Sequence, residues 1–248
     1  MDAAQKIREA VDQVSARRQR CMADPLLARA VAQVKRFQAR RFAATYADLL
    51  ATGPFRAAAQ FFLDELYGDQ DFSQRDQQFA RIAGALQRIF PKEAAVTAVA
   101  LAELHALTEQ LDFEMAQAWL GAAFPEGSSE ASRYASCWRS VARRDDRTAQ
   151  LEWVLKLGRE LEKLTRAPGL RLLLRMMRGP AAAAGLGDLQ RFLESGFETF
   201  SALASEKGLT AEFLGIIEQR ESHWMQQLFD ADPLVCAAEL ESALGQAR

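Results

Sequence analysis

The sequence predicts an all-α protein, and both its composition and its periodicity lead to this prediction. The 248 residues include only 9 Val, 5 Ile and 8 Thr, the β-branched residues in which strands are normally rich. Ala, Leu, Arg, Glu and Gln favour helix, and apolar residues recur every three or four positions along the chain. We therefore expect a single domain over residues 1–248, with about ten to twelve helices in an orthogonal or bundle-like array.

The N-terminal third predicts helices separated by clear breaks. Residues 2–21 form a polar amphipathic helix whose thin apolar seam (Ile7, Val11 and Val14) suggests a peripheral element that docks on the rest or on a second copy. Asp24-Pro25 is an N-cap followed by proline at the first helical position, and the helix it opens extends to about residue 50. Thr52-Gly53-Pro54 then breaks the chain.

The stretch from Phe61 to Asp76 is the densest mixture of aromatic, acidic and turn-forming residues in the sequence. It continues a five-residue apolar stripe at helical spacing, formed by Phe55, Ala58, Ala59, Phe62 and Leu66. Gly68 is expected to end this helix in the left-handed conformation. Ser73 is expected to cap the next helix, with Asp76 near its N-terminus.

The rest of the chain continues the helical pattern. Pro91 opens a long helix to about residue 124, and residues 125–129 form the clearest loop, which we place between two halves of one domain. Further helices are expected at the following ranges: 129–143, 146–166, 169–178, a strongly amphipathic segment around 189–203, one capped by Thr210, and a short terminal one capped by Asp232-Pro233.

Two blocks of sequence resemble an uncharacterised family of proteobacterial helical proteins. The first is the FFL-x-x-LYG-x-x-DF-x-x-RD stretch from Phe61 to Asp76, and the second runs from Gly185 to Phe197. The resemblance implies one integral helical domain and attaches no activity, cofactor or partner to it.

Charge and composition exclude several classes of function. The net charge is −2, so no basic field attracts nucleic acid. The three cysteines (Cys21, Cys137 and Cys236) are far apart with no Cys-x-x-Cys pair, which argues against a zinc site. No run reaches the ~18 apolar residues of a membrane span, and the charged N-terminus is not a secretory signal. The Arg- and Ala-rich chain is expected to be a bacterial, cytoplasmic protein with no metal and no cofactor.

One polar group stands out as a candidate ligand site. His105, Glu109 and Asp112 lie at i, i+4 and i+7 on one Ala-rich face of the long predicted helix. Burial of these charges is costly without partners, and Arg75 or Arg81 from the preceding helix could supply the countercharge. The simplest interpretation is a structural cluster; a small-ligand pocket, or a haem site with His105 or His223 as axial ligand, is the alternative.

Enzymatic motifs are missing from the sequence. The repeated Glu-x-x-His pairs of di-iron helical bundles do not occur, nor does Gly-x-Ser-x-Gly. A basic stripe is present instead, formed by Arg171, Arg175 and Arg178 at i, i+4 and i+7. Its stems could snorkel over the core, or it could bind an anion or an acidic partner.

These observations favour a non-enzymatic helical protein that binds a protein partner or assembles with its own copies. The alternative is a small-molecule or cofactor-binding helical protein, haem included, or an enzyme, using His105, Glu109 and Asp112.

Overall fold

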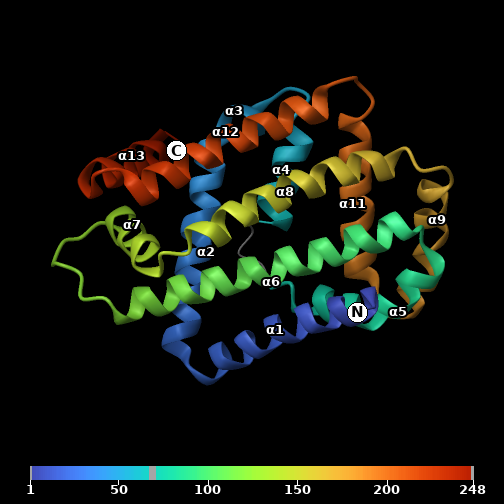
Figure 1. The fold of residues 1–248 in the computed structure, drawn as a ribbon, viewed down its shortest axis with the longest axis horizontal. Helices are drawn as coiled ribbons and strands as arrows, with labels where there is room; N and C mark the ends of the chain where they lie inside the picture. Colours follow the sequence, from blue (N-terminus) through green and yellow to red (C-terminus); the bar gives the residue numbers. More distant parts are fainter. Residues whose placement is uncertain (1, 67–70, 247–248) are drawn as a thin grey trace. The chain divides into compact units, whose positions relative to one another are not determined.

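Helices account for all the regular secondary structure of residues 2–66 and 71–246, which the computed structural model describes (Figure 1). In chain order they are α1 (Ala3–Ala23), α2 (Pro25–Thr45), α3 (Ala47–Ala51), α4 (Arg56–Glu65), α5 (Ser73–Ile89), α6 (Lys92–Gly121), α7 (Glu130–Val141), α8 (Arg144–Thr165), α9 (Leu170–Met176), α10 (Arg178–Ala183), α11 (Gly187–Leu203), α12 (Leu209–Asp230) and α13 (Pro233–Gln246). The predicted all-α class is confirmed. No helix of these residues is long and apolar enough to cross a membrane.

The described residues form thirteen helices, more than the ten to twelve expected, because some expected helices are interrupted and continue as separate short ones. The helix expected from Pro25 to about residue 50 is interrupted at Tyr46, whose φ of −115° and ψ of 22° are not helical, and α3 starts anew behind it. The expected end of α4 at Gly68 lies outside the described residues.

The chain divides into two compact units, each assembled from three separate stretches. Unit 1 comprises Met1–Ala16, Gln70–Ala106 and Glu152–Gly215, and unit 2 comprises Arg17–Asp69, Leu107–Leu151 and Ile216–Arg248. The loop at 125–129 lies within unit 2, so it does not mark the division.

Unit 1 is built around α11, which packs against α5, α9 and α10. The amphipathic stripe expected over 189–203 is buried there: Leu189, Phe192, Gly196, Phe197, Phe200 and Leu203. A small apolar cluster joins Leu170 and Leu174 of α9 to Phe197. The sequence prediction for this helix is thus confirmed by its packing.

The N-terminal helix α1 is anchored in its own chain. Its apolar seam is buried, with Ile7 and Val14 almost without exposed surface. Within unit 1, Lys6 also forms an ion pair with Glu103 of α6, with 3.8 Å between Nζ and Oε1. Because the seam is covered here, it is not a free surface for a second copy.

Unit 2 has a larger aromatic core around α2. Helix α13 packs against α7 and α2, and the rings of Phe37 and Tyr134 stack with centroids 4.3 Å apart. The same cluster takes in Trp138 of α7 and Trp224 of α12. These four aromatic residues come from three helices, α2, α7 and α12, so they tie distant parts of the sequence into one core.

Helix starts follow the predicted capping in part. Asp24 accepts hydrogen bonds from the backbone N–H groups of Leu26 and Leu27, and Asp232 caps α13 in the same way. The predicted Thr210 cap is wrong: α12 begins at Leu209, and the Thr210 hydroxyl is buried without a hydrogen-bond partner among the described residues. Thr210 therefore lies inside the first turn, where it cannot cap.

The start of α5 is also shifted from its prediction. Asp71 accepts hydrogen bonds from the backbone N–H and the hydroxyl of Ser73. Ser73 is already the first residue of the helix. A carboxylate two residues upstream thus takes the capping role expected of Ser73.

Candidate functional site

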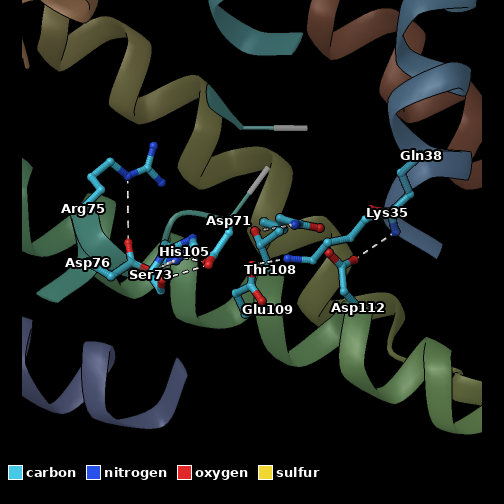
Figure 2. A network of polar contacts seen from close by, with 11 residues as sticks. Lys35, Gln38, Asp71, Ser73, Arg75, Asp76, His105, Thr108, Glu109 and Asp112 are labelled. Atoms are coloured by element: carbon cyan, nitrogen blue, oxygen red, sulfur yellow. Dashed lines mark hydrogen bonds and ion pairs between the residues drawn. The ribbon is translucent and has the colours of Figure 1, made fainter. Parts of the chain in front are cut away.

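The first of the three predicted site residues, His105, belongs to unit 1 and is paired there. Its Nε2 lies 2.9 Å from Oδ2 of Asp76 on α5, a carboxylate that is only 4% exposed (Figure 2). A haem iron or another ligand at Nε2 would have to displace this carboxylate. The contact therefore occupies the nitrogen that an axial ligand would use.

Arg75 adds a cation to the same group. Its Nε lies 3.8 Å from Oδ1 of Asp76, and its guanidinium covers the rings of Phe72 and Phe192 at 4.0 and 4.6 Å from their centroids. Two aromatic faces and a carboxylate thus hold the Arg75 side chain within unit 1. A cation stacked in this way is fixed in place and serves packing as well as charge balance.

Glu109 and Asp112, the other two predicted residues, find their partners in unit 2. Lys35 of α2 forms an ion pair with Glu109. One turn further along α2, Gln38 donates from Nε2 to Oδ1 of Asp112 over 2.9 Å, and both of these side chains are buried (Figure 2). Each of the two carboxylates is thereby matched to a polar group of α2.

The structure thus gives the three residues of α6 separate partners. The sequence prediction offered Arg75 or Arg81 as their countercharge. Arg75 instead approaches Asp76, Arg81 donates to the carbonyl oxygen of Ala184 over 3.0 Å, and Lys35 neutralises Glu109. Such matching is what allows charged groups to be buried.

A second buried polar group, which the sequence prediction missed, connects α2 to α12 within unit 2. Arg41 donates from both terminal nitrogens to the two oxygens of Glu221, over 2.8 and 2.9 Å. The Tyr46 hydroxyl donates to the same carboxylate over 3.0 Å. All three residues are buried, so this is a bidentate, charge-assisted contact in a largely dry setting.

A sequence signal for this group existed but was weak. Lys35, Gln38, Arg41 and Thr45 recur every three or four positions on α2, so polar residues share one side of a helix that also carries Val34 and Phe37. Such a stripe is normally a solvated face. Only the contacts with α6 and α12 show that Gln38 and Arg41 are buried and that Lys35 and Thr45 are half-buried.

The basic stripe predicted over residues 169–178 is divided between α9 and α10, because Arg178 is already the first residue of α10. Arg178 donates to both oxygens of Glu194 over 2.7 and 2.9 Å. Arg171 donates to the Ser201 hydroxyl and lies over the Phe197 ring. Arg175 is exposed and forms no ion pair within the described part of the chain. Three arginines with such different surroundings do not make a single anion-binding pocket.

Burial changes the acidity of Asp112. Removal from water raises the pKa of its carboxyl above the usual 3.8, an effect that the Lys35 ammonium only opposes. Because the folded protein holds this proton more tightly than the unfolded chain, the contribution of Asp112 to the free energy of unfolding is greatest at low pH. It falls as the pH rises above 3.8.

Asp112→Asn should therefore unfold at a higher urea concentration than the wild type at pH 7, and this advantage should shrink toward pH 4. The amide keeps an oxygen for Gln38 and carries no charge. Urea titrations at several pH values measure the effect. The control is Asp145→Asn, at an exposed position, which should unfold at the same urea concentration as the wild type at each pH. An Asp112→Asn protein that is less stable at pH 7 would show that attraction to Lys35 outweighs burial.

Fold and contacts together define an all-helical protein whose most site-like polar residues are matched within its two units. The chain belongs to the family of the domain of unknown function DUF8198, which matches it over residues 17–235. No curated protein and no solved structure matches the chain. Within the described residues, no group of three or more His, Cys, Asp or Glu side chains is placed to hold a metal ion.

Proposed function

We propose that this chain is a protein-binding or assembly protein that acts through exposed helical faces rather than as a catalyst. The observation that supports this function is the exposure of large apolar side chains in neighbouring pairs. Leu172 and Met176 of α9 are 61% and 66% exposed, and Leu234 and Val235 of α13 are 80% and 58% exposed. We also propose, from the sequence, that the protein is bacterial and cytoplasmic and that the stretch Phe61–Asp76 is a signature of its family.

The arrangement of these side chains favours recognition over chance exposure. Leu172 and Met176 are four residues apart, so they lie on the same side of α9. Its opposite side is occupied by Leu170 and Leu174, which are buried in unit 1. Single exposed apolar residues are ordinary, whereas adjacent ones form a patch that a partner can cover. Covering it would contribute about 25 cal/mol for each Å² of apolar surface removed from water.

The buried carboxylates also support a binding function over a catalytic one. Three of the most buried carboxylates form hydrogen bonds within the protein: Asp76 with His105, Asp112 with Gln38, and Glu221 with Arg41. Catalytic acids and bases need access to a substrate, and these side chains contact other parts of the protein instead. The apolar surface of α9 and α13 is the better candidate for function.

Site-specific photo-crosslinking in the living cell tests this function. A photoreactive amino acid at position 172 or 234 should give adducts of defined mass, identified by mass spectrometry. The same amino acid at Lys156 of α8 or Gln33 of α2, both exposed polar positions, is the matched control and should give none. Equal labelling at all four positions, or none at any, would contradict the proposal.

A further inference from the structure

The surface around α9 lies in the most one-sidedly basic part of the chain. From Lys163 to Gly187 the sequence holds five basic residues and no acid; they are Lys163, Arg166, Arg171, Arg175 and Arg178. Three of the five form ion pairs with Glu160, Glu162 and Glu194. Arg171 and Arg175, which flank the exposed Leu172 and Met176, form none with described residues. This α9 face therefore combines two apolar side chains with two basic ones.

The exposed side of α13 has the opposite character. From Ser222 to residue 247 the sequence holds four acids and neither Lys nor Arg; the acids are Asp230, Asp232, Glu239 and Glu241. Asp230 is paired with Arg144 and Glu239 with His223. Glu241 is exposed, seven residues after Leu234 and hence on the same side of the helix, and has no ion pair with described residues. This α13 face combines two apolar side chains with an acidic one.

We infer that the partner is a second copy of this chain, bound head to tail, with the α9 face of one copy on the α13 face of the next. The inference rests on the proposed function and names its partner. Each face offers an apolar pair and exposed charge that forms no ion pair with described residues of its own unit, and the charges of the two faces are opposite. Each copy carries both faces, so the contact is heterologous.

Charge decides between this pairing and a symmetric one. Two α9 faces brought together would oppose Arg171 and Arg175 to their own copies, and two α13 faces would oppose Glu241 to itself. Like charges brought together at an interface are unfavourable, whereas complementary charges fix partner and register. The α9–α13 contact is the arrangement that buries both apolar pairs and matches both charges.

Complementation between two face variants tests the inference on the full chain. One variant carries Leu172→Asp and Met176→Asp, and the other carries Leu234→Asp and Val235→Asp. All four positions are exposed, so both proteins should fold, which far-UV circular dichroism checks. Sedimentation should show concentration-dependent association of the wild type, weakened by added salt. Each variant alone should associate at least about tenfold more weakly.

The decisive sample is an equal mixture of the two variants. Each retains the face that the other has lost, so the mixture should form a one-to-one heterodimer that goes no further. Lys156→Asp in unit 1 and the pair Ala32→Asp with Gln33→Asp in unit 2 change the charge equally at exposed positions, and both should associate like the wild type.

Three results would overturn the head-to-tail contact: a wild type that stays monomeric, variants that associate unchanged, or a mixture without heterodimer. Crosslinks from positions 172 and 234 to a different protein would contradict this inference but would still support the proposed function. The proposed function and the head-to-tail contact together predict crosslinks between copies of the chain at positions 172 and 234.

Discussion

Glu221→Ala should lower the free energy of unfolding by about 3–5 kcal/mol, the usual cost of removing one partner from a buried ion pair. The substitution leaves the Arg41 guanidinium and the Tyr46 hydroxyl without the carboxylate to which both donate. Arg41 is only 6% exposed, so water cannot easily replace that carboxylate. Urea unfolding followed by tryptophan fluorescence measures the loss, because Trp138 and Trp224 belong to the same unit.

Asp48→Ala is the matched control for this loss. Asp48 pairs with Arg220, the neighbour of Glu221 on α12, in an equally bidentate contact over 2.7 and 2.8 Å. The Asp48 side chain is 59% exposed, and exposed pairs contribute about 0–1 kcal/mol. Equal losses for the two variants would show that the Arg41 group is hydrated and contributes no more than a surface contact.

Phe37→Ala should cost about 3–5 kcal/mol, the range found when a large core side chain is removed. Phe37 has no exposed surface and stacks on Tyr134 in the core of unit 2. Its loss leaves a cavity among side chains from several helices, which cannot all move to fill it. The same urea titration reports the change.

Two further variants show whether the cavity is the cause. Phe37→Leu should lose less than Phe37→Ala because it refills part of the volume. Val96→Ala, at a position 60% exposed on α6, should stay within about 0.5 kcal/mol of the wild type. A Phe37→Leu protein as unstable as Phe37→Ala would point to the ring stacking, and a fully tolerated Phe37→Ala would contradict the packing described here.

Local features of the fold were readable from the sequence because they depend on residues close together in the chain. The Asp24-Pro25 start of α2 and the apolar stripe of α11 each follow from spacing within one or two turns. Thr210 shows the limit of such reasoning, since a residue suited to capping lies one position inside the helix. Position within the first turn depends on how α12 packs, which local chemistry does not determine.

Interaction partners that are far apart in the sequence could not be predicted from local spacing. Glu221 is 180 residues from Arg41, and no periodicity links them. The sequence correctly indicates that Glu109 and Asp112 need partners, but it suggests Arg75 or Arg81, because their helix α5 directly precedes α6 in the chain. Lys35, 74 residues away from Glu109, reaches it because α2 and α6 pack together. The sequence thus indicates which groups need a partner, whereas the tertiary fold supplies it.

The interleaving of the two units limits how this protein can be dissected. The chain passes from one unit to the other five times, and four of the passages fall inside the helices α1, α6, α8 and α12. A nick in the loop at 125–129 would leave each unit composed of segments from both fragments. Neither unit exists as a contiguous piece of polypeptide, so truncation cannot assign a property to one of them. Point substitutions within an intact backbone are the route by which each unit's role can be separated.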